Sequence, residues 1–490
     1  MKKYFYILVF AVLMGGLTSC NDWLDVSPKD RIPADKMFES ESGFKDILTG
    51  AYLKLGTANL YAGDMKYGYL DELAGLYCDY PGYNTNSVYN QAIVFDYTNQ
   101  FLSKKDNLYL EMYNVVANLN NLLQNIETHR DVLKTPHYYE CIKGEALGLR
   151  AFIYFDLLRL FGPIYSEHPT DAAIPYKTTY DKEPTPVLPA NQVVEKILED
   201  LKAAEALLKD NDPCDFHTAI DQRTDFLSNR EFRMNLYAVK AMMARVYCYS
   251  GQNDLAVQYA QEVINANKYF TLYKSQTASN YNSIRYGEQI FGLSVNQLNN
   301  TLISNSMDME NTSVQQRYGM TADMFTKVYE GITSDWRQNV VAFNWDESHQ
   351  YAFCLKYNQA PLADNSGADA IPLIRLPEMY YIIAECAANA ETSAEALNTV
   401  RLSRGIPYSD EIHTLGYDDK DATSEENKQQ TRRINEIMKE YRKEYYAEGQ
   451  LFFFLKAHHY TTYYGCGVAN MTSKEYQMPL PDNEKIFGNN

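Results

Sequence analysis

The sequence is short of positive charge and of tryptophan. Its 490 residues carry 45 Lys and Arg against 63 Asp and Glu, a formal net charge of −18. A chain this acidic lacks the basic surface that phosphate binding needs, so nucleic-acid binding is excluded as its main function. The 3 tryptophans stand beside 42 tyrosines. Tyrosine joins a flat apolar face to a hydroxyl, which suits sugars or peptides, although about half of these rings are expected in the core.

Catalytic and metal-binding motifs are also missing. The sequence contains no HExxH, Gly-x-Ser-x-Gly, P-loop or dinucleotide-binding pattern. None of the 8 cysteines forms a CxxC pair, and 7 remain after Cys20, an odd number. We therefore predict no disulfide framework, no metal site and no cofactor. Cys248 and Cys386 are predicted to be buried as small hydrophobes, and His458-His459 lacks a third ligand at metal-binding spacing.

Long apolar runs are absent except at the N-terminus, and the mean hydropathy is −0.43, which excludes a polytopic membrane protein. Residues 4–14 form an apolar stretch after Met1-Lys2-Lys3, too short for a membrane span and typical of a secretory signal. Leu17-Thr18-Ser19-Cys20 follows as a bacterial lipobox. The sequence predicts a lipoprotein signal peptide over 1–19, acylation (palmitate) of Cys20, and an extended tether over 20–35. The alternative is a plain signal peptide with an incidental cysteine.

Hydrophobic periodicity predicts helices in the first half of the chain. Apolar residues recur at helical spacing over 36–55, 107–128, 138–161 and 191–210. Gly162-Pro163 ends the third of these helices. The Pro- and Thr-rich stretch 165–189 is expected to run extended along the surface.

A helical repeat follows. In 233–266, Ala244, Tyr247, Ala256 and Ala260 fall at tetratricopeptide spacing, and Gly251 lies at the turn. A second copy over 376–401 keeps the spacing with Ala384 and Ala396. Small residues at these positions let antiparallel helices touch. The predicted fold class is mainly α: a tetratricopeptide-like helical-hairpin solenoid with an irregular, loop-rich lobe that carries a few short strands.

The lobe lies between the two repeats. Residues 276–373 lack helical periodicity, and 288–295 is predicted to be a strand. A closing helix is expected over 432–456. We predict one domain over 36–490, with N-terminal helical hairpins in 36–275, the inserted lobe in 276–373 and a C-terminal helical part in 374–490.

Several charged residues could form an ion pair, a catalytic pair of carboxylates or a calcium site. Arg375 and Glu378 are three apart and are expected to pair on one helical turn. Glu440, Glu444 and Glu448 share a predicted helical face, which raises the alternative of glycosidase carboxylates, but they lie on one helix rather than across a cleft. The acidic run 418–427 could bind calcium, yet it lacks the EF-hand glycine and spacing, so a solvated charge run is favoured.

An ordered set of short motifs resembles the SusD/RagB family of outer-membrane nutrient-binding lipoproteins. The motifs cover nearly the whole mature chain, and two positions depart from the family pattern: Pro377, where a small residue is usual, and His458-His459, where an arginine is frequent. The motifs are, in order, Cys20 to Asp25 with Pro28, Leu149-Arg150-Ala151, Leu160 to Pro163, Ala244 to Tyr247, Glu288 to Phe291, Lys356-Tyr357, Ile374 to Glu378, Ala384-Glu385-Cys386, Glu440 to Glu444, Glu448-Gly449-Gln450 and Leu480-Pro481.

The resemblance implies a non-enzymatic, lipid-anchored protein of the outer membrane that faces the cell exterior. Such proteins capture oligosaccharides for uptake and act as a lid on a SusC-like TonB-dependent transporter. Some relatives bind peptides, so a peptide ligand stays open. A surface glycan hydrolase on a helical scaffold is the less favoured alternative.

The resemblance also implies that ligand contacts come from loops within 79–97 and 281–345, and chemistry selects residues within them. Aromatic residues in a loop have no helical face to bury, and amides supply hydrogen bonds to hydroxyls. Arg317 beside Tyr318 pairs a planar cation with an aromatic ring. Trp336 and Trp345 are alternatives, although Asp335 and Arg337 beside Trp336 suggest a structural pair. The predicted ligand-binding residues are Tyr80, Tyr83, Asn84, Asn86, Tyr89, Arg317, Tyr318 and Trp336.

Overall fold

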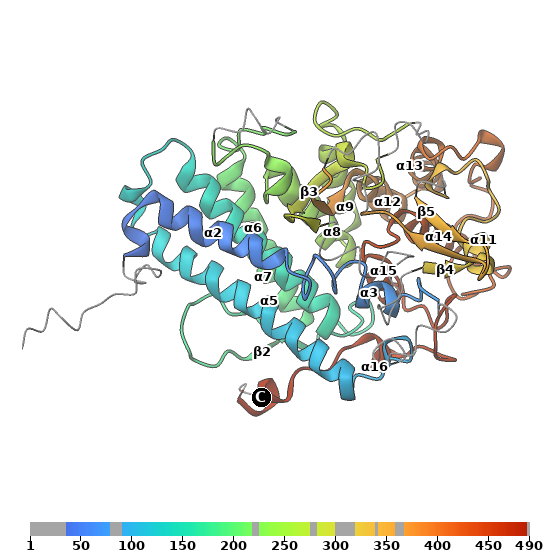
Figure 1. The fold of residues 1–490 in the computed structure, drawn as a ribbon, viewed down its shortest axis with the longest axis horizontal. Coiled ribbons are helices and arrows are strands. Elements are labelled where there is room, and N and C mark those ends of the chain that lie inside the picture. Colours follow the sequence, from blue (N-terminus) through green and yellow to red (C-terminus); the bar gives the residue numbers. More distant parts are fainter. Residues whose placement is uncertain are drawn as a thin grey trace, which may run out of the picture.

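A computed structural model describes residues 36–78, 91–217, 225–274, 282–298, 319–338, 342–357 and 367–487. Helices dominate these ranges, and the strands are few and short, so the predicted mainly α fold class is confirmed. In Figure 1 the N-terminal helices pack side by side at one end of the molecule, the three-stranded sheet lies at the other, and the C-terminus lies back below the N-terminal helices.

The N-terminal helices are α2 (Glu41–Leu55), α3 (Tyr69–Leu73), α5 (Asn99–Ile126), α6 (Tyr138–Phe161) and α7 (Ala190–Leu208). Four of them overlap the four predicted ranges, α5 begins eight residues before the predicted 107, and the short α3 lies outside those ranges. Ser40 caps α2 by accepting a hydrogen bond from the Gly43 amide. α6 is buried along almost its whole length, and a Cβ at Gly144 or Gly148 would clash with Leu208 or Met234, so the glycines allow this close packing. No helix among the described residues is long and apolar enough to cross a membrane.

Two helical hairpins stack in the middle of the fold. They are α8 (Leu236–Tyr249) with α9 (Asn253–Ile264), and α12 (Leu376–Cys386) with α13 (Ala390–Ser403). Gly251 makes the first turn with φ +74°, a conformation that favours glycine. Ala244, Ala256 and Ala260 are fully buried where the helices touch. The tetratricopeptide-like reading of this region is therefore confirmed, and α9 packs on α12 to join the two hairpins.

The strands form three small antiparallel sheets. The stretch predicted to be extended contains β1 (Ala172–Pro175) and β2 (Val187–Pro189), which pair with each other. The predicted strand is β3 (Gln289–Ser294), which pairs with β7 (Ala370–Arg375). The third sheet has the order β4–β6–β5 and is built from β4 (Gly319–Thr321), β5 (Phe343–Asp346) and β6 (Tyr351–Cys354), with α11 (Ala322–Val328) following β4.

The C-terminal part corrects one prediction. A single helix over 432–456 is wrong: α14 (Arg432–Glu444) ends, and α15 (Leu451–Ala457) begins after a break. Ala447 and Gly449 take left-handed φ of +64° and +66°. The Gly449 amide donates to Asp71 Oδ1 at 2.9 Å, and a Cβ on Gly449 would lie 2.3 Å from the Met65 carbonyl oxygen. Contact with a segment far away in sequence therefore breaks the helix.

Short elements complete the chain. α16 (Ser473–Tyr476) and α17 (Asp482–Phe487) lie near the C-terminus, and Thr472 and Glu475 form a capping box at α16. The 3₁₀ turns are η2 (Met37–Glu39), η3 (Arg130–Val132), η5 (Arg230–Phe232), η6 (Tyr286–Glu288), η8 (Trp336–Gln338) and η9 (Tyr408–Asp410).

A buried ionic cluster joins the lobe to the hairpins, and it corrects a second prediction. Arg375 does not pair with Glu378: it is the last residue of β7 and contacts Glu444 at 2.7 Å, Glu448 at 2.7 Å and Glu288 at 3.1 Å. Glu378 instead binds Arg245 at 2.5 Å. We call Glu288, Arg337, Arg375, Arg404, Glu444 and Glu448 the Glu444 cluster. All six are buried.

Candidate functional site

The three-stranded sheet is the platform of the candidate site, at the right of Figure 1 beside α11 and α14. β6 is central and pairs with both β4 and β5. Thr321 ends β4 and caps α11 by accepting a hydrogen bond from the Met324 amide at 3.3 Å. The strand therefore turns directly into a helix, which fixes the edge of the sheet.

Two distant segments meet at this edge. The Cys78 amide donates to the Gly319 carbonyl oxygen at 3.0 Å, and the Tyr351 hydroxyl donates to the Cys78 carbonyl oxygen at 2.7 Å. Only glycine fits at 319, because a Cβ there would lie 2.3 Å from both the Ala352 oxygen and the Tyr351 ring. Residues 79–90 leave from Cys78, and residues 299–318 arrive at Gly319. These two stretches belong to the predicted ligand-binding loops 79–97 and 281–345, so the contact between Cys78 and Gly319 joins the first loop to the second.

Most of the predicted site residues lie outside the described part of the chain. This holds for the acylated residue Cys20, for the tyrosine and asparagine set Tyr80, Tyr83, Asn84, Asn86 and Tyr89, and for the pair Arg317 and Tyr318. Their positions as ligand contacts stay predictions.

Trp336 is placed in the interior. Its side chain is 8% exposed, and its indole N–H donates to the Ser403 carbonyl oxygen at 2.9 Å. The guanidinium groups of Arg285 and Arg404 lie 5.0 and 5.1 Å from the indole ring. Asp335 and Arg337 form the expected structural pair at 2.6 Å. This geometry gives Trp336 a packing role and leaves it no surface for a ligand.

Trp345 is better placed than Trp336 to stack on a ligand. It lies on β5, is only partly buried, and packs edge to face on Phe325 of α11 with ring centroids 4.9 Å apart. A partly exposed indole held by a second ring is a rigid surface for stacking. Trp345 therefore remains available at the sheet, whereas Trp336 does not.

A broad cleft lies beside this sheet, and sequence reasoning missed it. It has a volume of about 970 Å³ and is lined by the 415–426 segment, α14, 462–465 and Lys327. That volume is at the upper end of the usual range for ligand pockets. The backbone of Gly465 approaches that of Gly75, three residues before Cys78. The cleft and the anchoring point of the two segments are thus neighbours.

Tyr464 presents an aromatic ring with polar partners at this cleft. Its hydroxyl donates to Asp323 at 2.7 Å, and the Lys327 ammonium lies 4.3 Å from the ring centroid. The hydrogen bond from Tyr464 and a further one from Lys327 lower the pKa of Asp323. In the sequence, only the pattern Tyr463-Tyr464-Gly465 pointed to an aromatic residue in a loop here. Its partners on α11, Asp323 and Lys327, are known only from the structure.

The acidic run 418–427 is more strongly paired than a solvated charge run. Asp418 binds Arg433 at 2.6 Å, Asp421 accepts a hydrogen bond from Asn435, and Glu426 contacts Arg442. Burial raises the pKa of Glu426, but the Arg442 guanidinium outweighs it and holds that pKa below its usual value. Among the described residues, no group of three His, Cys, Asp or Glu is arranged for a metal ion.

The glutamates considered for glycosidase chemistry are buried ion-pair partners. Burial raises the pKa of Glu448, but Arg375 and Lys356 outweigh it and hold the value at about 2. The pKa of Glu440 and of Glu444 is likewise lowered, against burial, by neighbouring arginines and lysines. A glycosidase acid needs a raised pKa and a bond to protonate. These carboxylates serve to hold the fold together.

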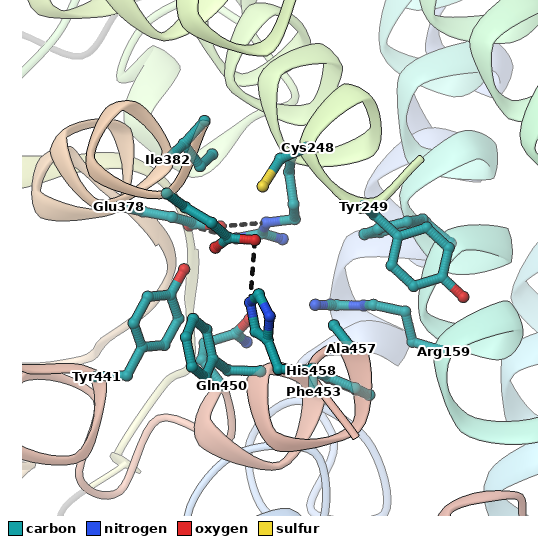
Figure 2. Close-up of a pocket in the computed structure, with 14 residues that line it drawn as sticks. Arg159, Cys248, Tyr249, Glu378, Ile382, Tyr441, Gln450, Phe453, Ala457 and His458 are labelled. Carbon is teal, nitrogen blue, oxygen red and sulfur yellow. Dashed lines mark hydrogen bonds and ion pairs between the residues drawn. The ribbon is translucent and has the colours of Figure 1, made fainter. Parts of the chain in front are cut away.

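A second cavity lies where α6, α8, α12 and α15 meet. Figure 2 shows Arg159, Cys248 and His458 directed into it, and the His458 ring contacts Glu385 at 3.1 Å. Its volume is about 60 Å³, well below the several hundred Å³ of ordinary ligand pockets. His458 and His459 each pair with a glutamate rather than with each other, since His459 contacts Glu167.

Two family models match the chain. A model described as "Starch-binding associating with outer membrane" matches residues 22–248, and the SusD family model matches residues 296–483. SusD-like protein P2 of Formosa agariphila is 24% identical over 277 residues, which cover 56% of this chain and 48% of that protein. SusD-like protein P38 of the same organism is 23% identical over 279 residues. The chain spans about half the length of the curated relatives it matches.

Solved structures share the fold. A SusD superfamily protein from Bacteroides thetaiotaomicron has a TM-score of 0.68 at 18% identity, with coverage of 91% of this chain and 98% of that one. A structure titled as a SusD-like carbohydrate binding protein from Bacteroides vulgatus has a TM-score of 0.67 at 19% identity, with coverage of 92% and 96%. The described architecture is thus the one these proteins adopt.

Proposed function

The chain belongs to the SusD/RagB family, and from this membership we propose that it is a lipid-anchored surface protein that captures oligosaccharides for a TonB-dependent transporter of the outer membrane. Members of this family are typically carbohydrate-binding surface proteins rather than enzymes. The specific ligand, the anchor and the transporter are the parts proposed for this chain.

The hydrogen bond between Cys78 and Gly319 carries the proposal for the ligand site. The loops predicted to contact ligand, 79–97 and 281–345, were chosen for their tyrosines, amides and Arg317. The first begins directly after Cys78 and the second contains Gly319, and this contact of 3.0 Å joins those two residues. Segments anchored together can act on the same ligand. The partly exposed Trp345 and the Tyr464 side chain at the cleft both contact α11, and both are proposed to extend the surface.

The chemistry of this surface fits a carbohydrate. Pyranose rings present flat C–H faces, which stack on aromatic rings, and a rim of hydroxyls, which need paired donors and acceptors. Tyr80, Tyr83, Tyr89 and Tyr318 supply the rings in the sequence, and Asn84, Asn86 and Arg317 supply the polar groups. Trp336 is left out of the proposed site because it is buried.

The N-terminal sequence and the family membership support the proposed lipid anchor and the proposed transporter partner. Cys20 after Leu17-Thr18-Ser19 is the proposed acylation site, and it would hold the protein at the outer membrane with its body outside the cell. The proposed partner is a SusC-like barrel. Purification in mild detergent is expected to recover that barrel with the protein, and repeated recovery of the protein alone would contradict the partnership.

A glycan array followed by affinity measurements tests the ligand proposal. Tyr83→Ala and Tyr318→Ala are each expected to weaken binding of the selected glycan by about 1–3 kcal/mol without changing the melting temperature. Tyr180→Ala is the matched control, because Tyr180 is 53% exposed on the β1–β2 connection. Unchanged affinity in both test variants removes these residues from the site. Binding to a peptide library alone would favour the peptide alternative, and released sugar products would favour a hydrolase.

A further inference from the structure

A further pocket lies between the two helical hairpins, and it shares no described lining residue with the candidate site. Its volume is about 590 Å³, within the range of roughly 300–1,000 Å³ that ligand pockets have. Its lining comes from α9 with the segment that follows it, from α12, and from α13 with η9. Figure 1 shows α9 and α12 side by side, with α13 next to them. We call it the inter-hairpin pocket.

The floor of the inter-hairpin pocket is apolar. Phe270 and Leu376 line it and belong to the hydrophobic core, with exposed fractions of 1% and 2%. Ile264 and Leu272 also line it, and both are only partly buried, so they leave apolar surface open to the pocket. A ligand with one flat apolar face can therefore lie on this floor.

Tyr408 presents an aromatic ring at the edge of this pocket. Its side chain is 74% exposed, and its ring stacks on no other ring within the described ranges. The turn that carries it is held from both sides: the Arg401 guanidinium donates to the Asp410 carbonyl oxygen at 2.8 Å, and the Ile406 amide donates to the Arg401 carbonyl oxygen at 3.1 Å. The ring is thus available for stacking on a backbone that is already ordered, which lowers the entropic cost of binding.

Four polar side chains at the pocket make no hydrogen bond or ion pair within the part of the chain that the structure describes. They are Asn267, Thr271, Lys274 and Tyr380. The segment that carries two of them is fixed through its backbone, because the Thr271 amide donates to the Gly287 carbonyl oxygen at 3.3 Å and the Tyr273 amide donates to Glu288 at 2.9 Å. Donors and acceptors for a polar ligand therefore surround the apolar floor.

The pocket carries positive charge and no negative charge. Lys274 is the one charged side chain among its described lining residues, in a chain with 63 acidic residues. A carboxylate beside Lys274 would gain a charge-assisted hydrogen bond and would meet no lining carboxylate. The pocket therefore favours a ligand that combines a flat apolar face, hydrogen-bonding groups and one negative charge.

We propose that the inter-hairpin pocket is a second carbohydrate site, which takes a sugar residue that bears a carboxylate. The C–H face of the sugar stacks on Tyr408, its hydroxyls bond to Asn267 and Tyr380, and its carboxylate faces Lys274. The choice of a sugar as the ligand rests on the proposed function. Two sites on one chain would hold an acidic glycan at two points, and the second contact would form at high effective concentration.

Glucuronate and glucose are the probes, because they differ only at C6, where a carboxylate replaces the hydroxymethyl group. Saturation-transfer NMR with the full chain is expected to detect both sugars, with glucuronate bound about two- to fivefold more tightly at low salt. This preference should shrink at high salt, since Lys274 is exposed. No binding of glucuronate, or equal affinity for the two sugars, would overturn the proposal.

Two variants connect the binding to the pocket. Tyr408→Ala should weaken both sugars roughly tenfold, whereas Lys274→Gln should remove only the preference for glucuronate. Both side chains are exposed, so the melting temperature should not change. The matched controls are Tyr180→Ala and Lys182→Gln, exposed residues on the β1–β2 connection that should leave the affinity for both sugars unchanged. A preference for glucuronate that survives in Lys274→Gln would overturn the assignment of the charge.

The variants of the proposed ligand site distinguish the two sites. Tyr83→Ala and Tyr318→Ala should leave glucuronate binding unchanged if the inter-hairpin pocket holds this sugar. Glucuronate binding that is lost in these variants but kept in Tyr408→Ala would support the proposed function and overturn the second site. Glucuronate binding that depends on Tyr408, in a protein that selects no glycan on the array, would instead support the pocket and contradict the proposed ligand site.

Discussion

Replacing Glu444 by glutamine tests whether the Glu444 cluster stabilises the fold. Glu444 is fully buried and contacts Arg375 at 2.7 Å, Arg404 at 2.9 Å and Arg337 at 3.2 Å. Glutamine has the same shape but no charge, and its amide nitrogen would face guanidinium donors. Removing one partner of a buried ion pair costs about 3–5 kcal/mol. Arg337, Arg375 and Arg404 still contact Asp335, Glu448 and Glu288, which partly balance their charges. We therefore expect the free energy of unfolding to fall by about 3 kcal/mol, at the lower end of this range.

Urea unfolding followed by circular dichroism measures this loss. Glu444→Gln should shift the unfolding midpoint to lower urea without changing the slope. The matched control is Glu199→Gln, which breaks an exposed i,i+3 pair with Lys196 and should change stability by no more than about 0.5 kcal/mol. A loss in Glu444→Gln as small as in the control would show that the cluster contributes no net stability.

The pH dependence of the free energy of unfolding is an independent test of Glu444→Gln. Burial raises the pKa of Glu444, but the surrounding arginines outweigh it and hold that pKa well below its usual value. A lowered folded-state pKa contributes stability above the unfolded-state value of about 4.3, and this contribution is lost as the pH falls toward the folded-state pKa. The stability gap between wild type and Glu444→Gln should therefore be constant at neutral pH and narrow on acidification. A gap that widens on acidification would contradict the assignment of a charged Glu444.

Four further outcomes are expected. Ala256→Trp should cost about 1–3 kcal/mol or more, because Ala256 is fully buried where two helices touch, and a neutral melting temperature would mean that the contact was misjudged. Gly319→Ala should weaken glycan binding, because the added Cβ would push β4 away from β6. Gly50→Ala is the control, because a Cβ at Gly50 would have no atom within 4 Å. Equal glycan affinity in the two variants would mean that the ligand site does not depend on this sheet. Burial raises the pKa of Asp71 to about 8. The stability that this carboxyl contributes is therefore lost as the pH rises from about 4 through 8. If the unfolding free energies of wild type and Asp71→Asn change in parallel over that range, the pKa of Asp71 is not raised. Cys20→Ala should release the protein from the membrane fraction, and retention at the wild-type level would rule out the lipid anchor.

Local sequence patterns predicted the elements that local interactions determine. The 138–161 helix was predicted with the bounds that α6 has, because an unbroken apolar period ends at Gly162-Pro163. The paired hairpins and β3 were predictable for the same reason, since small residues and strand composition are visible in a short window. The break after α14 was not, because it depends on the contact between Gly449 and Asp71, 378 residues apart.

The candidate site was predictable in composition but not in arrangement. Tyrosines and amides in Pro/Gly-rich stretches singled out two segments, yet only the structure shows that Cys78, beside the first segment, is hydrogen-bonded to Gly319, within the second. Asp335 and Arg337 predicted a structural pair around Trp336, but the burial of the indole depends on Ser403 and Arg404 from a distant helix. Tyr464 was missed because its partners, Asp323 and Lys327, lie on α11, more than a hundred residues earlier.

The antiparallel pairing of β3 with β7 has a consequence for how such a protein can diversify. The pair brings the two ends of the lobe together just before α12 begins, so the helical hairpins meet the lobe through a fixed stem. The entropic cost of closing a loop rises only by about 0.6 kcal/mol for each doubling of its length. Changes of loop length between 295 and 369 that leave the β4–β6–β5 sheet and the buried contacts of Trp336, Arg337 and Lys356 in place can therefore accumulate with little effect on the stacking of α8, α9, α12 and α13. A new ligand preference can arise in that stretch while the scaffold that displays it stays unchanged.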